Sequence, residues 1–229
     1  MTHRRYLWIL FVLVAAAPPA MAHGVDDLTR RFLEQLTGPA IAPFLYLGAK
    51  HMVTGYDHLL FLVGVIFFIY TTREVLLYVS CFTLGHSVTL LSGVFAGIHL
   101  DAYLIDAIIG ASVAYKGLDN LGGLKRMLGF QPDIRAAVLV FGLFHGFGLA
   151  TKLQEFALPE HGLVTNILAF NVGVELGQFT ALALVLLVIA YWRRHPGFVR
   201  HAWVANLLLV SAGLVLIGYQ LSGYYVSEA

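Results

Sequence analysis

The sequence predicts an all-α protein, a polytopic bundle of about six transmembrane helices. Hydrophobic residues make up 59% of the 229 residues and charged residues only 12%, and the mean hydropathy is +0.80, a composition unlike that of soluble domains. Six apolar runs reach or approach the ~20 residues that a membrane-spanning helix needs. Three of these runs contain a histidine, namely His58, His86 and His145. Ionisable groups are costly in hydrocarbon unless they face a partner or a wet cavity, so these histidines indicate a functional site.

The first 22 residues have the pattern of a cleaved signal peptide. Two arginines precede the apolar run Leu7–Ala17, and two prolines then lead to the cleavage pattern Ala20-Met21-Ala22. The alternative, a retained first helix, is weaker because its apolar run is short and the prolines would break it. We therefore expect residues 1–22 to be absent from the mature protein.

The rest of the chain divides into an exported N-terminal segment (23–53), a bundle (54–221) and a C-terminal tail (222–229). Within the exported segment, Val25–Leu36 has leucines and a phenylalanine on one face and charges on the other, which predicts a short interfacial helix. The expected spans are Thr54–Tyr70, Val75–Ile98, Ala102–Leu121, Ala136–Leu153, Leu163–Trp192 and Ala202–Leu221.

Basic residues in the loops predict the orientation of these spans. With the mature N-terminus outside, the outer connections hold only Lys152, and the inner loops hold Arg73, Lys125, Arg126, Arg135, Arg193, Arg194 and Arg200. This agrees with the positive-inside rule and with an exported N-terminus. We expect a multi-pass protein of the bacterial inner membrane, in contact with the lipid bilayer.

Several functional classes are disfavoured. The formal net charge is +1 and no basic run is present, so no nucleic-acid partner is expected. The chain has no GxGxxG, Walker, CxxC or HExxH motif, and no permanently bound cofactor is predicted. Cys81 is the one cysteine and favours a small core residue over a ligand.

His51, Asp57 and His58 form the pattern H-x5-D-H. In a straight helix the two histidines share a face but stand ~10 Å apart along the axis, too far for one ion bound at about 2 Å. Either Thr54 and Gly55 unwind the turn between them, or the histidines serve successive positions along a path. Asp57 is then a carboxylate ligand or an acceptor that orients a histidine.

The remaining polar residues of the spans each allow a structural and a functional interpretation. His86 and His145 fit either hydrogen-bonded packing residues or ligands. Asn171, Glu175 and Gln178 form a stripe on one helical face, and a carboxylate in this stripe must face the bundle interior. Lys116 either neutralises Asp106 or Asp119 structurally or has a role in transport.

Four ordered segments resemble the HupE/UreJ membrane proteins, particularly their second branch: GAKHMVTGYDHLLFL, FTLGHSVTL, FGLFHGFGLA and FNVGVELGQ. They extend from about Leu47 to Gln178. The His-Asp-His arrangement is also similar to the signature of nickel/cobalt permeases. The resemblance implies an inner-membrane protein for nickel or cobalt uptake, with His51, Asp57, His58, His86 and His145 as ligands of the metal path and Glu175 as a further candidate.

Two functions follow as alternatives. Imidazole and carboxylate suit Ni²⁺, Co²⁺ or Zn²⁺, so the favoured function is transport of a divalent transition metal, nickel or cobalt first. The alternative is an intramembrane zinc hydrolase whose site is built from three histidines, Asp57 and Ser87. A closed three-histidine site with an open fourth position would favour the hydrolase, and ligands that follow one another along a path would favour the transporter.

Overall fold

The computed structural model describes residues 38–154 and 161–228, and the regular structure within these ranges is helical. The helices are α3 (Ile41–Thr54), α4 (Tyr56–Ile66), α5 (Thr72–Phe95), α6 (Ala102–Asn120), α7 (Gly123–Leu128), α8 (Ile134–Gln154), α9 (Leu163–Arg193) and α10 (Phe198–Glu228). The predicted signal peptide and the predicted interfacial helix Val25–Leu36 lie outside the described residues.

The helices confirm an all-α membrane bundle. Four of them, α5, α8, α9 and α10, are long and apolar enough to cross a membrane. Helix α6 has 19 residues, the length of a span, and carries charged side chains. The first predicted span, Thr54–Tyr70, contains the short helix α4, and the helix before it, α3, lies in the stretch that the sequence assigned to the exported segment. The short helix α7 in the following loop was not predicted.

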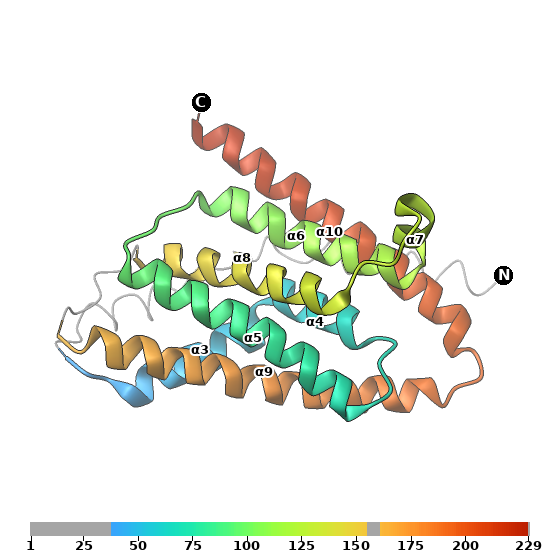
Figure 1. Ribbon diagram of the computed structural model, residues 1–229, viewed down its shortest axis with the longest axis horizontal. Coiled ribbons are helices and arrows are strands. Elements are labelled where there is room, and N and C mark those ends of the chain that lie inside the picture. Colours follow the sequence, from blue (N-terminus) through green and yellow to red (C-terminus); the bar gives the residue numbers. More distant parts are fainter. Residues whose placement is uncertain (1–37, 155–160, 229) are drawn as a thin grey trace.

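The long helices associate in pairs, as Figure 1 shows. Helix α5 lies against α8, α6 against α10, and α3 against α9. Helix α4 contacts α6, α9 and α10 as well as α3. Most of its side chains are buried, Asp57 and His58 among them. The helix that carries the central Asp-His pair therefore lies inside the bundle.

Small residues allow the paired helices to approach closely. A Cβ atom at Gly146 of α8 would collide with the Thr89 hydroxyl and the His86 carbonyl of α5. A Cβ atom at Gly48 of α3 would collide with the Phe170 carbonyl of α9. Thr89 also donates a hydrogen bond across the first interface, to the Leu143 carbonyl at 2.7 Å. Close backbone contact of this kind stabilises helix pairs in membranes, where lipid is as apolar as the side chains.

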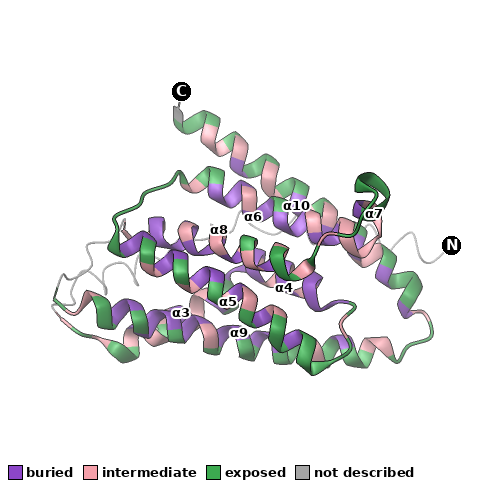
Figure 2. Ribbon diagram, in the orientation of Figure 1, coloured by how far each residue is buried: buried purple, intermediate pink, exposed green. Residues whose placement is uncertain are grey.

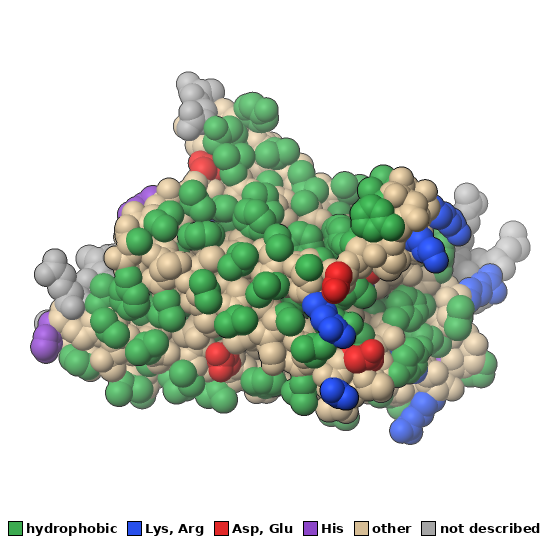
Figure 3. All heavy atoms as spheres, viewed as in Figure 1, with side chains coloured by type: hydrophobic (Ala, Val, Ile, Leu, Met, Phe, Trp, Pro, Cys, Tyr) green, Lys and Arg blue, Asp and Glu red, His purple; other side chains and the backbone are tan. Residues whose placement is uncertain are grey.

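The outer surface suits a lipid environment. Buried residues line the inner faces of the helices and exposed residues the outer faces (Figure 2). Hydrophobic side chains are spread over the whole visible face in Figure 3, and the lysines and arginines gather at the end where α7 and the α9–α10 connection lie. This asymmetry matches the loop charges on which the orientation was predicted.

Candidate metal centre

The break between α3 and α4 brings two predicted ligands together. Gly55 has non-helical dihedral angles (φ −74°, ψ 89°), and its N–H donates to the His51 carbonyl at 2.8 Å. The ring centroids of His51 and His58 are 5.1 Å apart, about half of the ~10 Å that a straight helix would impose. The turn is therefore unwound at Gly55, while Thr54 remains the last residue of α3, and the two imidazoles are neighbours.

Asp57 orients His58. Its Oδ1 atom lies 2.9 Å from the His58 Nδ1 atom and accepts the His58 backbone N–H at 2.9 Å. Both residues are almost fully buried, at 2% and 1% exposure. A proton on Nδ1 is directed at the carboxylate, so the lone pair of the neutral ring lies on Nε2. This arrangement of carboxylate and histidine is the one that supports metal-binding imidazoles in proteins.

His58 is the centre of a cluster of four imidazoles, which we call the histidine cluster (His51, His58, His86 and His145). The ring of His58 lies 4.6 Å from that of His145, 5.1 Å from that of His51 and 6.4 Å from that of His86. These side chains come from α3, α4, α5 and α8. The three histidines that the sequence placed inside apolar runs therefore meet in the bundle interior.

His145 is oriented by its own helix. Its Nδ1 atom donates to the Phe141 carbonyl at 2.7 Å, one turn earlier in α8, which leaves the lone pair on Nε2. The Nε2 atoms of His145 and His86 are buried and have no hydrogen-bond partner among the described residues. An unsatisfied buried polar atom costs about 1–3 kcal/mol. Two such nitrogens in one cluster are a reason to expect a ligand there.

The ligands are adjacent but do not enclose a single ion. Within residues 38–154 and 161–228, no three His, Cys, Asp or Glu side chains are arranged as a closed metal site. The Phe82 ring lies between members of the cluster, 4.9 Å from His145 and 6.1 Å from His86. The arrangement is a series of neighbouring imidazoles in an apolar, aromatic surrounding.

The polar stripe of α9 faces α5. Asn171 and Ser87 exchange two hydrogen bonds, at 2.9 and 3.1 Å, and Gln178 accepts one from Thr83 at 3.3 Å. Glu175 lies between them on α9 and is half-buried. Asn171 and Gln178 therefore join α9 to α5 before and after Glu175 in the sequence.

The structure shows which ion pairs the charged residues of the spans form. Lys116 pairs with Asp119 at 2.5 Å, one of the two partners that the sequence suggested for it. Asp106 instead pairs with Lys152 of α8, at 2.7 Å, a residue that the loop charges had assigned to a connection. Gln178 is 1% exposed, and its Nε2 atom has no partner within the described chain. Contacts between distant helices leave no signal in a single sequence. The hydrogen bond from His145 to the Phe141 carbonyl could have been predicted, because residues four positions apart lie on the same face of a helix.

Comparison with known proteins identifies the family. A model of the HupE / UreJ protein family matches residues 28–228, which includes all the described helices. Searches of curated proteins and of solved structures each found no match. The resemblance of the four sequence segments is thus confirmed over nearly the whole chain. The chain belongs to the HupE/UreJ family.

Proposed function

We propose that the protein carries a divalent transition metal across the membrane, with Ni²⁺ or Co²⁺ as the cargo. The observation that carries this proposal is the histidine cluster, in which His58, oriented by Asp57, adjoins three other imidazoles. Neutral imidazole is a good ligand for these ions. The Asp57 carboxylate offsets part of the charge of a divalent cation in an apolar surrounding.

The broken helix supports a cation site at this position. Helix α3 ends at Thr54, and the carbonyl ends of helices carry partial negative charge. Discontinuous membrane helices whose ends meet near the bilayer midplane supply ion sites in several transporter folds. His51 lies in the last turn of α3 and Asp57 in the first turn of α4, so the ligands surround such a break.

The order of the ligands favours transport over hydrolysis. A catalytic zinc site holds three protein ligands around one ion and keeps a fourth position open, and the described residues contain no closed group of this kind. Ser87, the serine of the hydrolase alternative, hydrogen-bonds with Asn171 rather than with a histidine. A half-buried His51 followed by the buried His58, His86 and His145 suits stepwise exchange of a cation between neighbouring ligands.

We place the protein in the inner membrane with its basic end in the cytoplasm and its mature N-terminus outside. The lysines and arginines at the end near α7 support this orientation (Figure 3), because basic residues are retained on the cytoplasmic side. The Ala20-Met21-Ala22 pattern independently supports an exported N-terminus.

The test is metal accumulation in cells, measured for nickel, cobalt and zinc together and divided by the amount of membrane-inserted protein. His58→Gln and His145→Gln are expected to abolish accumulation, since a glutamine amide binds first-row metals far more weakly than imidazole. Cys81→Ser is the control and should retain it. Normal nickel and cobalt accumulation in both histidine variants contradicts the proposal. If the parent accumulates no metal but shows a zinc-dependent hydrolysis of lipid or peptide that both variants lose, the hydrolase is correct.

A further inference from the structure

An aromatic series connects the histidine cluster to the basic end of the molecule. Phe61 follows His58 by three residues on α4 and therefore lies on the same side of the helix. Its ring is 5.9 Å from that of His145 and 5.4 Å from that of Phe141. The Phe141 ring is in turn 5.3 Å from that of Tyr115 on α6. The same short helix thus carries the central ligand and the first ring of this series.

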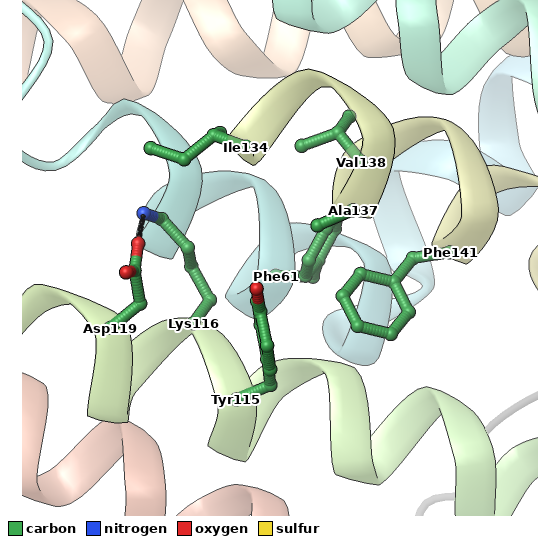
Figure 4. Close-up of a pocket in the computed structure, with 8 residues that line it drawn as sticks. All are labelled: Phe61, Tyr115, Lys116, Asp119, Ile134, Ala137, Val138 and Phe141. Carbon is green, nitrogen blue, oxygen red and sulfur yellow. Dashed lines mark hydrogen bonds and ion pairs between the residues drawn. The ribbon is translucent and has the colours of Figure 1, made fainter. Parts of the chain in front are cut away.

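These three rings line one side of a crevice between α4, α6 and α8, shown in Figure 4. Lys116, Asp119 and Val138 are among the other lining residues. The space between the side chains is too narrow to hold a water molecule. The crevice therefore has no room for a water molecule beside Phe61, Tyr115 and Phe141.

A buried ion pair from α6 lines this crevice. Lys116 is 4% exposed, and its ammonium contacts the Asp119 carboxylate at 2.5 Å, as the dashed line in Figure 4 marks. Gln131 donates to the other oxygen of that carboxylate. Charged side chains inside a membrane bundle are costly, pair with one another and mark ion pathways. An ammonium on a carboxylate occupies the place that a passing cation would take.

The ion pair is also in contact with α4. A Cβ atom at Gly64 would lie 3.0 Å from the Lys116 Cγ atom, so the stem of Lys116 packs directly on this part of the helix. A shift of α4 on binding a cation at His58 would move Phe61 and the surface under Lys116 together. This gives a physical connection between the histidine cluster and the crevice.

We propose that the crevice is the release gate of the metal path. Phe61, Phe141 and Tyr115 close it, and Lys116 acts as a tethered cation that holds Asp119, the carboxylate to which the leaving metal ion binds. The proposal rests on the proposed transport function. It assigns Asp119 as a second cation-binding site, separate from the histidine cluster and nearer to the basic end.

The gate is tested first without metal, by the reactivity of a cysteine in the crevice. Val138 is 1% exposed and lines the crevice, so Val138→Cys is introduced in a Cys81→Ser background. A small, permanently charged methanethiosulfonate reagent is applied to membrane vesicles of each orientation. Lys116→Met and Phe61→Leu are the gate variants. Lys152→Met, which breaks the Lys152–Asp106 pair, and Phe44→Leu, which alters a buried ring on α3, are the matched controls.

The cysteine in the gate variants should react about tenfold faster than in the parent, and only when the reagent is applied from the basic side. A tenfold change corresponds to about 1.4 kcal/mol in the free energy that keeps the crevice closed. The controls should react at the parent rate. Equal rates in parent and gate variants, or equal acceleration in the controls, overturn the proposal. Labelling is counted per membrane-inserted protein, and Lys116→Gln replaces Lys116→Met if the latter is not inserted.

The second test concerns Asp119 and uses nickel alone. Asp119→Asn should strongly reduce nickel flux into vesicles while nickel binding to the purified protein, which depends on His58, stays near the parent value. If the nickel flux of Asp119→Asn equals that of the parent, Asp119 is not a second cation-binding site. A parent that moves no metal but shows the expected labelling pattern contradicts the proposed transport function instead, so the two failures are distinguishable.

Discussion

His58 owes its orientation to one neighbouring residue. Asp57 contacts both its Nδ1 atom and its backbone N–H, and this fixes which ring nitrogen bears the lone pair. Asp57→Asn keeps the shape but removes the charge, so the affinity for Ni²⁺ should fall about 10–100-fold, the usual loss when an orienting partner of a metal-binding histidine is removed. Competition with a metal chelator measures this affinity in the purified protein.

The matched control is Asp133→Asn. Asp133 is exposed, directly precedes α8 and accepts a backbone hydrogen bond from Arg135 at 2.7 Å. Its substitution should leave the nickel affinity unchanged. Equal affinities of Asp57→Asn and the parent protein would show that the carboxylate has no part in metal binding.

At the scale of elements, the break at Gly55 is what allows His51 and His58 to approach. A Cβ atom at this position would lie 3.1 Å from both the His51 carbonyl and the His58 Nδ1 atom, so Gly55→Ala should displace the His58 ring. We expect a nickel affinity about tenfold or more below that of the parent, in a protein that still folds. The measurement is nickel titration alongside thermal stability in detergent.

Gly218→Ala serves as the control for this change, because it is a helical glycine of α10 with open space around its Cβ position. It should alter neither stability nor nickel affinity. If Gly55→Ala binds nickel as tightly as the parent, the conformation at Gly55 is not required for nickel binding.

Much of this arrangement was predictable from the sequence, and the remainder has a physical explanation. Apolar length located the helices, because a span must satisfy its backbone internally. The H-x5-D-H spacing limited His51 and His58 to two geometries, one of which is observed. The pairing of Asp106 with Lys152 was not predictable, because helix neighbours depend on packing between distant segments.

At the scale of the whole molecule, the charge asymmetry predicts which end faces the cytoplasm. Met127 lies on α7 and is 73% exposed, and His99 is exposed in the α5–α6 connection. In a Cys81→Ser background, a membrane-impermeant thiol reagent should label Met127→Cys only in inside-out vesicles and His99→Cys only in right-side-out vesicles. The opposite pattern would reverse the orientation, and labelling of both from one side would contradict the bundle topology.

The central claim is that the buried histidines hold the metal. X-ray absorption spectroscopy of nickel bound to the purified protein tests it most directly, because it reports the ligand atoms and the imidazole rings behind them. The account predicts nitrogen ligands at about 2.0–2.1 Å with imidazole scattering, and fewer imidazoles in His58→Gln and His145→Gln. A spectrum with oxygen ligands alone, or one identical in the parent and both variants, would contradict it.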